Sequence, residues 1–309
     1  MKTRIYAALF ALCVGALMTS GVEAGAVRQS GDADQDYVPT GKGWGAPGMS
    51  KRGARTIQSK TTNGINYHGG PVMLGTTNVY YIWYGNWSGN SAVTILGNLA
   101  LALGGSPYYN INTTYYDGGS NKVSNAVAAP ASMTDSYSRG AALTDNDVLA
   151  VVSNAISSGS LPQDPNGVYV VLTSADVNET SGFCTQYCGW HAHSNILGMD
   201  TKFSFVGNPD RCPSACSAQT TASPNGNIGA DAMASIIAHE VEETATDPDL
   251  NAWYDTRGYE NADKCAWKFG TVYKTANGSY ANMNLGGLNY LIQQNWLNAG
   301  GGKCALSYY

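Results

Sequence analysis

Apolar, β-branched and aromatic residues gather in short runs along the chain, and these runs predict a small set of strands. The clearest run is residues 78–87 (NVYYIWYGNW), bounded by Thr on one side and by Gly and Asn on the other. Residues 108–117 and 122–127 are predicted to be strands around the turn at Gly118-Gly119, and residues 167–177 and 202–206 are predicted to be buried strands.

Between these runs the apolar spacing changes to that of a helix. Residues 91–103 begin with Ser91 as a candidate cap, residues 144–158 open with Thr-Asp-Asn-Asp, and residues 229–246 form the longest helical pattern. Strands that alternate with helices indicate a single mixed α/β domain, with a mixed sheet covered by helices.

The N-terminus has a different pattern. Lys2 and Arg4 precede an apolar run, residues 5–18, and then Val22-Glu23-Ala24 supplies small residues at a cleavage site. We therefore expect residues 1–24 to be a secretory signal peptide. The alternative, a membrane anchor, needs about 20 apolar residues, and this run is shorter. Residues 25–62 are polar and Gly-rich without periodicity, which predicts a flexible leader or propeptide before an ordered domain at 63–309.

The charge of the chain limits the choice of partners. The net charge is −5, only 13% of residues are charged, and no basic cluster occurs. These features argue against nucleic acid as a partner. An exported chain of this kind would meet an extracellular protein or peptide substrate, or a cell-wall component.

One cysteine, Cys13, lies in the predicted signal, and six remain in the mature chain. An even number after an export signal predicts three disulfides. The alternative, a zinc cluster, usually places two residues between paired cysteines. The spacing favours local pairing of the two C-x3-C units, which leaves the last two cysteines to pair, although 15 connectivities are possible. The six cysteines are Cys184, Cys188, Cys212, Cys216, Cys265 and Cys304.

The strongest chemical signal lies near the end of the longest predicted helix. His239 and Glu243 are four residues apart, on one helix face, and Asp247 follows after another four. The segment resembles the zincin pattern H-E-x-x-H, with Glu in place of the second His. On this interpretation His239 and Glu243 bind Zn²⁺, and Glu240 is the catalytic base that takes a proton from metal-bound water.

The electrostatics of this segment support a cation. Pro248 ends the helix at Asp247, and carboxylates at a helix C-terminus each cost up to about 1 kcal/mol against the helix dipole. A bound cation would reverse that cost. The alternative interpretation is an acidic helix face exposed to solvent, with a single histidine.

Zinc needs a third protein ligand, and few histidines are available. His191 and His193 are two residues apart, so they would project to one side of an extended segment. Either of them, or Asp247, is a candidate for the third ligand. The alternative is that each histidine is structural, as we expect for His68 in its Gly-rich turn.

A second acidic set follows the helix and suggests a different metal. Carboxylate oxygens are the ligands that Ca²⁺ prefers, although the spacing here does not match an EF-hand loop. The set comprises Asp247, Asp249, Asp255, Glu260 and Asp263.

Several segments together resemble one known family. They are YHGGP at 67–71, VYYIWYGNW at 79–87, the loop from FC at 183–184 to CGWH at 188–191, CPSAC at 212–216, and the helix 229–248. The resemblance is to the EXORDIUM or phosphate-induced-protein family, and the H-E-x-x-E helix resembles that of its microbial members. It implies an exported, cell-wall-associated protein, linked in plants to growth and to phosphate or brassinosteroid responses, without an assigned activity.

Two functional hypotheses follow from the sequence. The first is a secreted zincin-like metallohydrolase, a metallopeptidase that uses metal-activated water, and it rests on the helix motif alone. The alternative is a non-catalytic extracellular protein of EXORDIUM type, with a role in the cell wall or in signalling and a structural calcium site.

Overall fold

The structure is a computed structural model that describes residues 64–309. The predicted signal peptide and the predicted leader at 25–62 lie outside the described residues. Among those residues, no helix is both long enough and apolar enough to cross a membrane.

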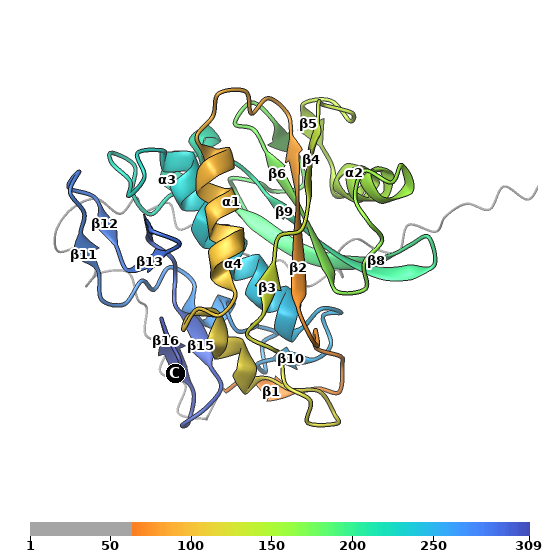
Figure 1. Ribbon diagram of the computed structural model, residues 1–309, viewed down its shortest axis with the longest axis vertical. Helices are drawn as coiled ribbons and strands as arrows, with labels where there is room; N and C mark the ends of the chain where they lie inside the picture. The colour runs from red at the N-terminus through yellow and green to blue at the C-terminus, as the bar shows by residue number, and fades with distance from the viewer. Residues whose placement is uncertain (1–63) are drawn as a thin grey trace, which may run out of the picture.

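A mixed six-stranded sheet forms the centre of the molecule (Figure 1). Its order is β3-β2-β6-β9-β8, with β4 also paired to β2; β8 is antiparallel to β9, and the other pairs are parallel. These strands are β2 (Thr77–Tyr84), β3 (Val127–Ala128), β4 (Ser132–Asp135), β6 (Gly167–Thr173), β8 (Gly189–Ile196) and β9 (Met199–Val206). The prediction of a mixed α/β fold is confirmed.

Helices cover both sides of this sheet, with α1 and α4 on one side and α2 on the other (Figure 1). All seven residues of β6 are buried, as expected for a parallel strand covered on both faces. The helices are α1 (Ala92–Leu103), η3 (Tyr109–Thr114), α2 (Asp145–Ser157), η4 (Pro209–Arg211), α3 (Pro213–Cys216), α4 (Ile228–Thr246) and η5 (Asp263–Cys265).

The remaining strands are short and pair two by two. They surround the central layers, mainly in the chain that follows α4 (Figure 1). The pairs are β1 (Asn66–Tyr67) with β10 (Trp253–Tyr254), β5 (Ala142–Leu143) with β7 (Asn178–Glu179), β11 (Tyr273–Lys274) with β12 (Tyr280–Ala281), β13 (Met283–Leu285) with β14 (Leu288–Tyr290), and β15 (Asn295–Leu297) with β16 (Lys303–Ala305).

Local sequence explains where the predicted helices begin. Thr144 and Asp147 form a capping box at the start of α2, and the Asn227 side chain accepts a hydrogen bond from the Ala230 N–H at the start of α4. Helix α4 ends at Thr246, and its C-cap Asp247 directly precedes Pro248. The three predicted helices are therefore confirmed.

Of the strand predicted at 122–127, only Val127 lies in a strand, β3. The strand predicted at 108–117 is wrong. Most of it is the 3₁₀ helix η3, and only Tyr116 pairs with Lys122 in an isolated bridge. Tyr109 and Tyr115 are fully buried. Aromatic residues are enriched in strands, but they also fill the core wherever it is needed. Here they fill the core, and their enrichment alone does not distinguish the two cases.

The predicted pairing of the C-x3-C units is also wrong. The disulfides are Cys184–Cys212 and Cys188–Cys216, which join the two units side by side across 28 residues. Cys212 and Cys216 flank one helical turn, so their side chains point the same way and face the other unit rather than each other. The third pair, Cys265–Cys304, is confirmed, and so is the number of disulfides.

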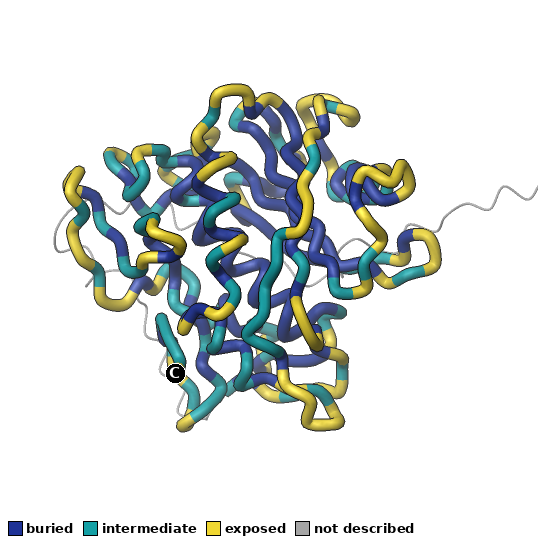
Figure 2. Tube along the Cα trace, in the orientation of Figure 1, coloured by how far each residue is buried: buried dark blue, intermediate teal, exposed yellow. Residues whose placement is uncertain are grey.

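Burial along α4 is unusual for its sequence. Seventeen of its nineteen residues are buried, and Figure 2 shows it running through the interior. A helix buried on all sides is normally apolar all round. The second half of α4 instead carries one histidine and three glutamates into the core.

Candidate metal centre

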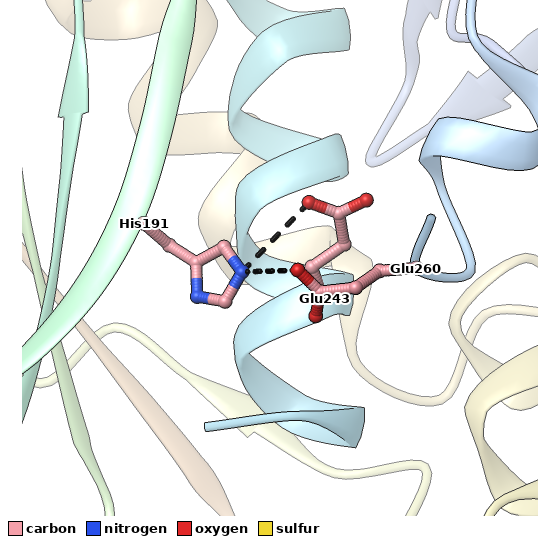
Figure 3. Close-up of side chains that lie close together, drawn as sticks. All are labelled: His191, Glu243 and Glu260. Carbon is pink, nitrogen blue, oxygen red and sulfur yellow. Dashed lines mark hydrogen bonds and ion pairs between the residues drawn. The ribbon is translucent and has the colours of Figure 1, made fainter. Parts of the chain in front are cut away.

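A single carboxylate oxygen, Glu243 Oε2, lies at the meeting point of two histidines. It is 3.1 Å from His239 Nε2 on the same helix and 3.9 Å from His191 Nε2 on β8. Figure 3 shows His191 pointing from its strand toward Glu243 on α4. The structure thus brings together three of the residues that the sequence proposed as metal ligands.

Two further carboxylates complete the arrangement from the segment around η5. Glu260 Oε2 lies 3.0 Å from His191 Nε2, and Asp263 Oδ1 lies 3.5 Å from His239 Nε2. The Asp263 N–H donates to Glu243 Oε1 (2.9 Å), which fixes the orientation of the central carboxylate. We call His191, His239, Glu240, Glu243, Glu260 and Asp263 the core cluster.

The alternation of side chains along β8 brings His191 to the helix. Residues 189, 191 and 193 share one face of the strand, and this face lies against α4. A Cβ atom on Gly189 would lie 2.6 Å from Ile236 Cγ2 and 3.0 Å from Glu240 Oε1. Glycine at this position therefore permits the close approach of strand and helix that brings His191 within reach of Glu243.

Glu240 lies on the His239 side of the core cluster. One ligand atom from each of His239, Glu240 and Glu243 falls within 4.8 Å of the other two, and the same holds for His191, Glu243 and Glu260. The two triads share Glu243. Glu240 is thus adjacent to the position where a metal ion held by His239 and Glu243 would sit.

The core cluster is removed from solvent. His239, Glu240 and Glu243 are each 0% exposed, Glu260 is 1% exposed and His191 is 5% exposed. Ionised groups in such a place cost several kcal/mol each unless they are paired. Among the described residues that contact these carboxylates, the positive partners are histidines rather than lysine or arginine.

The pKa values follow from this burial. Burial raises the pKa of the Glu260 and Asp263 carboxyls well above their usual range, and the nearby Glu243 carboxylate raises both further. For His239 burial lowers the pKa, but the Glu243 and Asp263 carboxylates outweigh that effect and hold the pKa well above 6.5. The contribution of the neighbouring carboxylates to each shift has the same sign, and a bound cation would oppose it.

Two other predicted ligands, His193 and Asp247, lie apart from the core cluster. His193 lies 2.8 Å from Asp200 and 3.9 Å from Asp249, whose carboxylate also pairs with Lys202 at 2.5 Å. The four residues His193, Asp200, Lys202 and Asp249 form what we call the surface cluster, since the His193 side chain is one-third exposed.

Asp247 is buried, but backbone groups hold it. Its Oδ1 accepts hydrogen bonds from the N–H groups of Asn251 and Ala252, both at 2.6 Å. Burial raises the pKa of Asp247 to about 7. Its carboxylate caps the chain that leaves α4.

The acidic set proposed for calcium is divided among separate partners. Asp255 pairs with Lys264 at 3.0 Å and accepts backbone N–H groups, and Asp249 belongs to the surface cluster. Glu260 and Asp263 instead face the two histidines. Their role beside His191 and His239 was missed from the sequence, because only the fold shows which side chains approach α4.

The fold and this site define a disulfide-bonded mixed α/β protein with a buried histidine and carboxylate cluster. Residues 65–300 match the family model described as phosphate-induced protein 1 conserved region, and the chain belongs to this family. No solved structure matches the chain.

The relatives with curated names are plant proteins. The chain is 33% identical to Protein EXORDIUM-like 3 of Arabidopsis thaliana, over 75% of this chain and 80% of that protein. It is 28% identical to Protein EXORDIUM of the same plant (68% and 74% covered) and 23% identical to Protein PHOSPHATE-INDUCED 1 of Nicotiana tabacum (79% and 88% covered). None of these three names states an enzymatic activity.

Proposed function

We propose that this chain is an extracellular, non-catalytic protein of EXORDIUM type whose core is held together by a buried transition-metal centre. The observation that supports this proposal most directly is the position of Glu243 Oε2 between His191 and His239, which come from different elements. A metal ion here would join β8, α4 and the segment around η5. Such a centre would stabilise the fold in the way that structural zinc sites do.

Burial favours a structural role over a catalytic one. Every side chain of the core cluster is almost fully enclosed, whereas a catalytic zinc keeps a position open to water and substrate. The membership of the chain in a family whose names state no activity points the same way. Extracellular location fits the three disulfides, which persist in oxidising compartments.

The donor atoms favour Zn²⁺ or a similar ion over Ca²⁺. Imidazole nitrogens suit zinc, copper, iron and nickel, whereas calcium takes six to eight oxygens. In the core cluster two imidazoles approach the central carboxylate at 3.1 and 3.9 Å. Ligand atoms of one tetrahedral zinc are roughly 3–3.5 Å apart, from bond lengths of about 2.0–2.1 Å, so only small movements are required.

Elemental analysis of the purified mature protein tests the proposal. We expect a transition metal at one or more ions per chain, and a melting temperature that falls when the metal is removed with a chelator. The Glu243→Gln variant should lose the metal. Glu242→Gln is the matched control, because it removes an equally buried carboxylate of α4 whose charge also acts on His239 and Glu243, but which bonds Tyr108 and Asn295 and belongs to neither triad. A wild-type protein without stoichiometric metal, or with calcium alone, would disprove the proposal.

A second candidate function is the zincin-like metallopeptidase, which one observation favours. Glu240 lies with His239 and Glu243 in one triad, where a general base is expected. In that case Glu240 would hold the proton taken from a water molecule, and β8 would have to move to admit a peptide. The Glu240→Gln variant should then bind metal but hydrolyse no peptide. Equal activity of wild type and variant would dismiss this candidate.

The partner of the protein and its place among microbial family members stay predictions. A cell-wall component is the partner that fits the non-catalytic proposal, and an extracellular peptide is the one that fits the peptidase. Binding of the mature protein to isolated cell walls, compared with turnover of a peptide library, distinguishes them.

A further inference from the structure

We infer that the core cluster binds two divalent metal ions, bridged by Glu243, rather than one. This inference rests on the proposed metal centre and goes beyond it by assigning the number of ions and the ligands of each. The first ion takes His191, Glu260 and Glu243; the second takes His239, Glu240, Asp263 and Glu243.

The geometry of Glu243 suits a bridging position. Its Oε1 accepts the Asp263 N–H at 2.9 Å, so Oε2 is the atom that remains to bind metal. A carboxylate oxygen has two lone pairs, and Oε2 has one histidine nitrogen at 3.1 Å and another at 3.9 Å. One oxygen can therefore contribute to two ions, one beside each histidine.

The number of donors also exceeds the needs of one ion. A structural zinc takes four ligands, but the core cluster offers six side chains. They fall into two triads that share only Glu243, with Asp263 3.5 Å from His239 on one side. Two ions that share Glu243 use every member of the cluster.

The balance of charge also indicates two ions. Four carboxylates carry four negative charges when they bind metal, and two neutral histidines carry none. Two divalent ions neutralise this set, whereas one ion leaves two negative charges in a site that is closed to water. The same donor set, four carboxylates and two histidines, holds the paired ions of the di-iron and di-manganese carboxylate proteins.

An unsatisfied atom gives independent support. Glu260 is 1% exposed, and among the described residues its Oε1 has no hydrogen-bond partner, although its Oε2 faces His191. A buried carboxylate oxygen without a donor is costly. Coordination of the first ion by both Glu260 oxygens would satisfy it.

Manganese provides a direct test in the wild-type protein. The mature chain is folded with its disulfides in the presence of excess Mn²⁺, freed of unbound metal, and examined by native mass spectrometry and electron paramagnetic resonance. We expect two Mn²⁺ per chain and an exchange-coupled spectrum, because two ions bridged by one carboxylate lie about 3.5–4 Å apart. Two uncoupled ions, or one ion per chain, would overturn the inference; the latter would leave the proposed metal centre intact. No bound ion, with Mn²⁺ or with Zn²⁺ in its place, would overturn both.

Variants then assign the ions to their ligands. His191→Ala should retain one ion, on the His239 side, and His239→Ala should retain one on the His191 side; each should lose the coupled spectrum. Glu242→Gln should keep both ions and the coupling. If both histidine variants are folded by circular dichroism and still bind two coupled ions, the assignment is wrong. Should neither fold, the stoichiometry and coupling of the wild type decide the question.

Discussion

Two histidines on one face of β8 differ in burial, and only the buried one belongs to the candidate metal centre. His191 and His193 are two residues apart, and each lies between carboxylates. His191 is 5% exposed and shares the core with glutamates whose positive partners, within residues 64–309, are histidines. His193 is one-third exposed, and Lys202 neutralises its carboxylate partners. The same residue pattern therefore has different consequences, because water and lysine satisfy the surface cluster but not the core cluster.

The largest expected effect comes from the central carboxylate. Glu243→Gln removes the charge that both histidines of the core cluster approach, and should destabilise the protein by about 3–5 kcal/mol, as loss of one partner of a buried ion pair does. Chemical denaturation monitored by fluorescence measures this change, with Glu242→Gln as the control for helix α4. A loss of stability below 1 kcal/mol would show that the core cluster depends on its charged contacts no more than the surface cluster does.

The disulfide at the start of β8 should have the next largest effect. The double variant Cys188→Ser/Cys216→Ser should lose about 2–4 kcal/mol, a typical value for a native disulfide. The Cys184–Cys212 pair closes a loop of the same 28 residues, so its removal relaxes the unfolded chain to the same extent.

The two double variants should differ in metal content rather than in stability alone. Cys188 directly precedes the strand that carries His191, whereas Cys184 lies four residues further away. We expect lower metal content only in the variant without Cys188–Cys216, as measured by elemental analysis. Equal metal content in both variants would show that this disulfide does not position His191.

A smaller effect should follow from crowding between β8 and α4. Gly189→Ala places a Cβ atom 2.6 Å from Ile236 Cγ2 and 2.9 Å from the Phe205 carbonyl oxygen. Overpacking of this kind costs about 1–3 kcal/mol. We expect a lower melting temperature and weaker metal binding, since the strand must move away from Glu243. Unchanged metal affinity would mean that the core cluster tolerates a wider spacing.

The smallest effect should come from the surface cluster. His193→Ala should change stability by less than about 1 kcal/mol, as expected for exposed ion pairs, and should leave the bound metal in place. Denaturation and elemental analysis, run beside His191→Ala, measure both quantities. Loss of metal from His193→Ala would mean that the two clusters act as one site.

The sequence by itself determined most of the regular elements and the central motif. Helix α4 and its end before Pro248, as well as the strands β2, β6 and β9, follow from local patterns. The number of disulfides follows from the cysteine count and the export signal. The four-residue spacing of His239 and Glu243 placed them on one helix face, and their contact at 3.1 Å agrees with it.

Only the tertiary structure decided which distant residues join His239 and Glu243. The choice of His191 rather than His193, the approach of Glu260 and Asp263, and the crossed pairing of the C-x3-C units depend on how β8, α4 and the segment around η5 pack. Burial was also invisible in the sequence, where a helix with this many acids suggests a solvated face. Periodicity is a property of neighbouring residues and fixes local geometry. Contacts between residues 20 to 69 positions apart depend on packing over the whole domain, which no local pattern encodes.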